Sequence, residues 1–126
     1  MSIVEITQQF GFDAAHYLEH APQSSNRRMH GHSFYAEVTL RGEPDSVKGW
    51  VRDFGEVNSA ISEIRAGLDH QLLNEVAGLG APTLENIALY IFREARARIP
   101  ETCRVRLSRP SSGQSCVYEE PDRDAQ

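Results

Sequence analysis

Three histidines have the residue type and spacing of a metal site. His30 and His32 are two positions apart, so on an extended chain their side chains project from the same face and can hold one ion together. His16, in the preceding segment, is the third candidate, and imidazole is a common metal ligand. We therefore predict a metal site formed by His16, His30 and His32. For His16 alone, a buried imidazole bonded to a backbone group is an open alternative.

Two further features carry chemistry. Asp69 and His70 are adjacent and have the types of a proton-transfer pair, but neighbouring side chains need not touch, and a polar loop is an open alternative. Arg109 follows Val105 and Leu107 at the inward parity of a predicted strand. An inward arginine is costly unless it is paired or faces a ligand, so Arg109 is a candidate binding residue.

Two segments that must position the histidines show the alternation of half-buried strands. Between residues 3 and 16, and again between residues 30 and 41, most apolar residues fall at even positions. His16, His30 and His32 share that parity, and strands that are neighbours in sequence usually pair. The three imidazoles should therefore lie together on the inner face of a sheet, where a cation is the best explanation for a cluster of neutral imidazoles. Residues 17–29 between the strands read as a polar loop.

Two helices and a hairpin are predicted next. Asp53 and Glu56 have the spacing of a capping box, and Thr83 after Pro82 is the N-cap of the second helix. The apolar stripes are Phe54, Val57, Ile61, Ile64 and Leu68, then Leu84, Ile87, Ala88, Ile91, Phe92 and Ala95, with Arg93, Glu94 and Arg96 left exposed. Residues 104–109 and 115–119 form the hairpin. This order predicts an α+β fold, a four-stranded antiparallel sheet with both helices on one face. Its open edges favour self-association.

Composition excludes several classes of protein. The chain has 126 residues, enough for one domain, which we place at residues 1–120 with a flexible tail at 121–126. The 13 Lys and Arg are scattered among 18 Asp and Glu, which argues against a nucleic-acid partner. No apolar run could span a bilayer and no signal peptide is visible, so we expect a cytoplasmic protein without a membrane partner. Cys103 and Cys116 are then expected to be reduced.

Several motifs, in order, resemble one family. These motifs are residues 12–16 (FDAAH), 29–34 (MHGHSF), 53–54 (DF), 68–74 (LDHQLLN) and 82–88 (PTLENIA). Together they are similar to the 6-pyruvoyl-tetrahydropterin synthase and 6-carboxy-tetrahydropterin synthase (QueD) family, and the resemblance covers roughly residues 3–118. It implies the tunnelling fold, whose trimers close a barrel and usually pair into hexamers, with active sites between subunits.

The resemblance also implies roles for residues. His16, His30 and His32 would bind zinc and leave a fourth position open for water or substrate. The zinc would polarise side-chain oxygens of dihydroneopterin triphosphate and so make neighbouring C–H protons easier to remove. Asp69 and His70 would be the catalytic dyad, with the imidazole moving protons. The remaining implied site residues, which border the pterin pocket, are Thr83 and Glu85.

Two positions depart from the family pattern. Asn26 stands where the family has its catalytic cysteine, and an amide cannot exchange a proton near neutral pH. Arg109 stands where a glutamate anchors the pterin, and a guanidinium only donates hydrogen bonds. We therefore predict a zinc-dependent lyase with an altered substrate or reaction, in which Asn26 and Arg109 contact the small-molecule substrate. A non-catalytic, zinc-bearing ligand-binding paralogue is the alternative.

Overall fold

The computed structural model describes residues 2–121, and its centre is one four-stranded sheet. The strands are β1 (Val4–His16), β2 (His30–Gly42), β3 (Thr102–Arg109) and β4 (Gln114–Glu119), in the order β1-β2-β3-β4. All neighbouring strands are antiparallel, which confirms the predicted sheet. Most of the predicted flexible tail, residues 122–126, lies outside the described residues.

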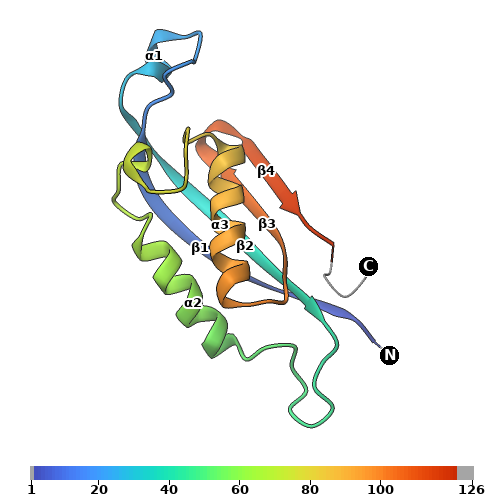
Figure 1. Cartoon of the computed structure of the whole chain (residues 1–126). Helices are drawn as coiled ribbons and strands as arrows, with labels where there is room; N and C mark the ends of the chain where they lie inside the picture. Colours follow the sequence, from blue (N-terminus) through green and yellow to red (C-terminus); the bar gives the residue numbers. More distant parts are fainter. Residues whose placement is uncertain (1, 122–126) are drawn as a thin grey trace.

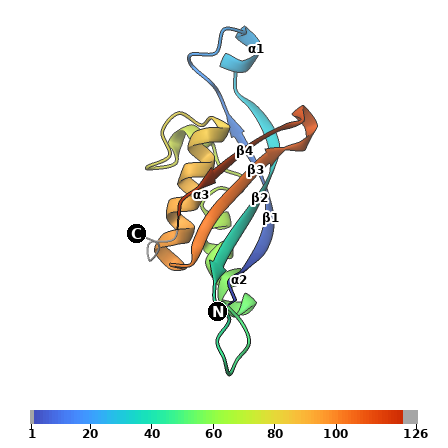
Figure 2. The same ribbon diagram turned by 90° about the vertical axis from the view of Figure 1, so that its right-hand side faces the viewer.

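Two long helices, α2 (Phe54–Ala66) and α3 (Leu84–Arg98), cover one face of this sheet (Figure 1). Helix α2 packs on β1, and α3 packs mainly on β3 and β4, so the molecule has two layers (Figure 2). The order of strands and helices is the predicted α+β arrangement. Within the described residues, no helix is long and apolar enough to cross a membrane.

The core forms because the even-numbered residues of the first two strands face the helices. Ile61 and Ile64 of α2 and Ile87, Ile91 and Phe92 of α3 cover that face. The buried strand residues are Phe10, Phe12, Ala14, Phe34, Ala36, Val38, Leu40, Val105 and Leu107. His16 continues the same face and is fully buried. The core therefore extends directly to the end of the sheet that carries the histidines.

Three local predictions were wrong. Asp53 occupies the N-cap of α2, but its side chain makes no capping bond, and Glu56 instead pairs with Arg52 at 2.9 Å. Phe54 is 45% exposed, because as the first residue of α2 it lines a hollow with Val4 and Ile6 at the start of β1 instead of packing in the core. Arg96 is buried: its guanidinium lies over Phe92 and bonds Glu120, near the end of the chain. A long-range carboxylate thus makes burial of an arginine tolerable.

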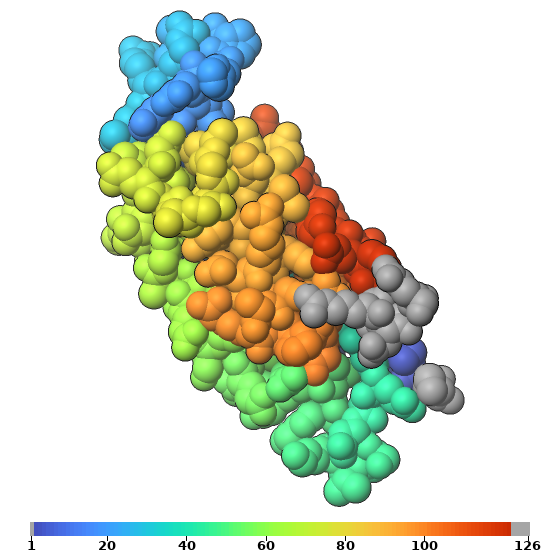
Figure 3. All heavy atoms as spheres, viewed as in Figure 1, coloured from blue at the N-terminus to red at the C-terminus, as the bar shows by residue number. Residues whose placement is uncertain are grey.

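The segment between β1 and β2 contains a short helix that was not predicted, α1 (Ser24–Arg27). This segment projects from one end of the molecule (Figure 3), beyond the N-terminal end of α3 (Figure 1). Leu18 N–H donates to the Asn26 carbonyl at 2.9 Å, so the segment folds back on itself. Shorter 3-10 turns occur at Leu73–Glu75 and Pro110–Ser112, and the second of these closes the β3–β4 hairpin.

Candidate metal centre

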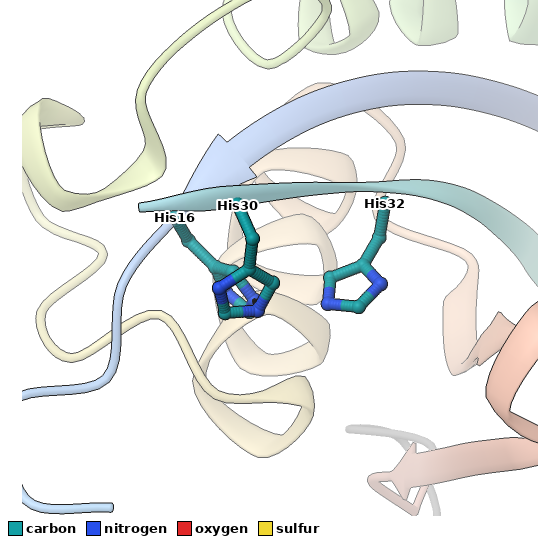
Figure 4. Close-up of side chains that lie close together, drawn as sticks. All are labelled: His16, His30 and His32. Atoms are coloured by element: carbon teal, nitrogen blue, oxygen red, sulfur yellow. Dashed lines mark hydrogen bonds between the residues drawn. The ribbon is translucent and has the colours of Figure 1, made fainter. Parts of the chain in front are cut away.

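The three histidines meet where β1 ends and β2 begins. His16 and His30 are paired in register across the two strands, and His32 lies opposite Ala14. The three imidazole rings gather on one side of the strands (Figure 4), with ring centroids 4.6 to 5.0 Å apart. One ring nitrogen from each lies within 4.8 Å of the others. The structure therefore brings together the three residues that strand parity selected.

Two backbone carbonyls fix the tautomers of His16 and His30. Nδ1 of His16 lies 2.9 Å from the carbonyl oxygen of Pro82, and Nδ1 of His30 lies 2.7 Å from that of Arg28. Because a carbonyl only accepts, each Nδ1 must carry the hydrogen, and each neutral ring presents a bare lone pair at Nε2.

Those two Nε2 atoms lie 3.0 Å apart. Two lone pairs facing each other at this distance repel, unless a cation or an added proton lies between them. Tetrahedral zinc with bonds of about 2.0 to 2.1 Å holds its nitrogens roughly 3.3 Å apart, which is close to the observed spacing. The donor set, the tautomers and the spacing thus fit a divalent metal of the zinc type.

The surroundings favour neutral imidazoles. Burial, ahead of repulsion by His30 and Arg109, lowers the pKa of His16, although the Pro82 carbonyl acts in the opposite direction. Burial, followed by the charge of Arg109, lowers the pKa of His32 to about 4. Because a metal competes with protons for the same lone pair, low pKa values keep both ligands available at neutral pH.

This shift predicts acid sensitivity of the metal-free protein. The ordinary pKa of His32 is 6.5 and that in the folded chain is about 4, so between these values the unfolded chain binds more protons. His32 does not reduce the free energy of unfolding above pH 6.5. Its destabilising effect grows as the pH falls and reaches its full size below about pH 4. We expect the melting temperature of metal-free protein, measured by circular dichroism, to fall as pH is lowered through this window. In His32→Asn the fall should be smaller, and an equal fall would contradict the prediction.

Asp69 and His70 are adjacent but not hydrogen-bonded to each other. Oδ1 of Asp69 accepts from the Asp13 N–H at 3.0 Å, Oδ2 lies 3.2 Å from Arg65, and the His70 Nε2 is 3.9 Å away. The His70 side chain is 78% exposed, and its φ of 59° is uncommon for a residue other than glycine. The backbone N–H of His70 donates to the Asp13 carbonyl at 2.7 Å. The pair is thus anchored on β1, with the imidazole directed to solvent.

The predicted substrate-binding residues lie in three places. Thr83 caps α3 by accepting from the Asn86 N–H at 3.2 Å, and it lines a cavity of about 500 Å³ beside the residue 17–21 segment. Arg109 ends β3 at the inward parity, and Glu85, exposed in the first turn of α3, is close enough for its charge to act on Arg109. Asn26 is exposed on the projecting α1, and it does not line the cavities described here.

Sequence reasoning missed the supporting groups. The roles of the Pro82 and Arg28 carbonyls could not be predicted, because every residue carries a backbone carbonyl and nothing in the sequence marks these two. Asp13 and Ser33 face outward as a cross-strand pair, with Ser33 Oγ donating to Asp13 Oδ1 at 2.6 Å. Together with His32 and His70 they line a cavity of about 660 Å³. Their matching outward parity was the signal that could have found them.

Comparison with known proteins gives a consistent result. The model of the 6-pyruvoyl tetrahydropterin synthase family matches residues 5–121. The chain is 38% identical over 92 residues to 6-carboxy-5,6,7,8-tetrahydropterin synthase of Synechocystis sp. (69% of this chain, 70% of the relative) and 36% identical over 95 residues to dihydroneopterin monophosphate aldolase of Pyrococcus furiosus (75% and 77%). The structure of Caenorhabditis elegans 6-pyruvoyl tetrahydropterin synthase superposes with a TM-score of 0.83 at 25% identity, covering 96% of this chain and 98% of that one. The chain belongs to the 6-pyruvoyl tetrahydropterin synthase family.

Proposed function

We propose that this protein is a zinc-dependent lyase that acts on dihydroneopterin triphosphate or a related small molecule. The observation that carries the proposal is that the Nε2 atoms of His16 and His30 lie 3.0 Å apart, with their lone pairs facing each other. His32 completes a three-histidine set, which is typical of catalytic zinc because a fourth position stays open. When bound, zinc would polarise a substrate oxygen and so make a neighbouring C–H proton more acidic.

We assign proton transfer to His70, with Asp69 as its orienting carboxylate. Its imidazole is 78% exposed, so it can reach substrate, and imidazole is the side chain most often used for general acid–base catalysis. Retention of this pair supports an enzyme over the alternative, a non-catalytic zinc-bearing binding protein, because pure binding needs no proton-transfer group.

The active unit is proposed to be a homo-oligomer, a trimer or hexamer in which the sheets form a barrel. Strands β1 and β4 are the edges of the sheet, and edge strands pair readily with another copy. The outward direction of His70 suits a site completed by a neighbouring subunit. A cytoplasmic location stays an expectation from the sequence.

Asn26 and Arg109 support a changed substrate or reaction. Neither can do the work of the cysteine and glutamate that the family pattern places there, because an amide does not transfer protons and a guanidinium does not accept hydrogen bonds. The histidine cluster and the Asp69–His70 pair are intact, so the changes are confined to the parts that select substrate and complete the chemistry. We therefore place a different small molecule slightly ahead of dihydroneopterin triphosphate.

The test is release of triphosphate from dihydroneopterin triphosphate by zinc-loaded protein. If the reaction is that of the synthases, wild type should release triphosphate, and His70→Ala should be slower by about a hundredfold or more, because general acid–base catalysis contributes about that much. Lys48→Ala, which removes an exposed side chain between β2 and α2 that lines neither cavity, should match wild type. No release by protein with one zinc per chain would eliminate this substrate.

A further inference from the structure

Arg109 brings a positive charge to the same end of the inner face as the histidines. It is the last residue of β3 and follows the buried Val105 and Leu107 at their parity. The register of β2 and β3, continued by one residue, brings it level with Phe34, whose ring centroid lies 5.7 Å from that of His32 and 6.1 Å from that of His16. Arg109 therefore faces the space beside the metal centre.

The guanidinium of Arg109 is only partly satisfied. Its cross-strand neighbour Gln114 accepts a hydrogen bond from Nη2 at 2.5 Å. The Nε atom is buried and has no hydrogen-bond partner among residues 2–121. A buried donor without a partner is unfavourable, and more so when it is charged, so a ligand that accepts from Nε removes this cost.

The charges around this donor favour an anion. Glu85 is the acidic group that acts on Arg109, and it offsets one positive charge. A divalent ion on three neutral imidazoles would add two positive charges, which leaves the region with a net charge of plus two.

We propose that Arg109 binds a carboxylate group of the substrate beside the metal centre, through its Nε and Nη2. This inference rests on the proposed function and specifies its substrate class. The two N–H groups point along one edge of the guanidinium and match the two oxygens of a carboxylate. The amide oxygen of Gln114 already occupies the place of one of those oxygens, and an incoming carboxylate would displace it and satisfy Nε as well.

The test uses benzoate and benzamide, which share a shape and differ in charge, with isothermal titration calorimetry on the full zinc-loaded chain. Wild type should bind benzoate at least about tenfold more tightly than benzamide, because charge-assisted bidentate bonds are roughly twice as strong as neutral ones. Arg109→Gln should abolish this preference, whereas Arg109→Lys, which keeps the charge but loses the fork, should bind benzoate more weakly than wild type and keep part of the preference. Arg106→Gln, on the outward face of the same strand, should keep it.

The remaining outcomes separate the carboxylate site from the proposed function. Equal binding of benzoate and benzamide, or an equal loss in Arg106→Gln, overturns the carboxylate site. Tighter binding of phenyl phosphate than of benzoate would replace the carboxylate by a phosphate. Metal-free protein that keeps an Arg109-dependent benzoate preference supports the carboxylate site even if zinc proves absent from the native protein. Triphosphate release without any benzoate preference would leave the proposed function in place and remove this inference.

Discussion

Replacing His30 with alanine should reduce bound zinc from about one ion per chain to below about a tenth after dialysis, because two imidazoles without a third ligand hold zinc far more weakly. His30 is the most informative of the three to replace. It is only half buried and begins β2, so its loss removes a ligand without opening a cavity in the core. His16, in contrast, is fully buried, and its removal would also destabilise the fold. Metal content by plasma mass spectrometry measures the effect.

The matched control for this prediction is His20→Ala, which removes a histidine from the projecting segment between β1 and β2. It should keep one zinc per chain, and both variants should keep the far-ultraviolet circular dichroism of wild type. Zinc retained by His30→Ala would refute the assignment of the three histidines. So would wild-type protein that, purified without chelator and supplied with zinc, takes up none.

The sequence predicted the histidine cluster because strand parity is a local property with a long-range consequence. A period of two fixes which face each side chain takes, and pairing of consecutive strands then brings His16 opposite His30. The same logic predicted the buried faces of the strands and the inward position of Arg109. Helix capping was less secure: Thr83 forms its cap, but Asp53 does not.

The supporting contacts could not be predicted, because they join segments that no periodicity relates. Pro82 lies 66 residues from His16, yet its carbonyl fixes the tautomer of that ring. Asp69 is held by the backbone of Asp13, 56 residues away. The exposure of Asn26 depends on how the residue 17–29 segment projects from the sheet, and a polar loop gives no signal for its direction.

Replacing Arg109 with glutamate should create measurable binding of neopterin to the zinc-loaded protein. The amino group and ring N–H of a pterin are donors, so the guanidinium of Arg109 meets donors with donors, whereas a carboxylate accepts from both. One such mismatch costs on the order of 1 to 3 kcal/mol, so affinity should rise about tenfold to a hundredfold or more. Isothermal titration calorimetry with neopterin, on protein of verified zinc content, measures the change.

The control for this gain is Arg109→Gln, which removes the positive charge and supplies one acceptor but no carboxylate. It should show a smaller gain than Arg109→Glu, because a neutral amide oxygen accepts more weakly than a carboxylate and leaves one pterin donor unmatched. If both variants gained equally, relief of charge rather than hydrogen-bond matching would explain the effect. If Arg109→Glu still ignored neopterin while Arg109→Gln lost the benzoate preference, Arg109 would bind anions at a place the pterin ring does not reach, and the substrate would be a different molecule.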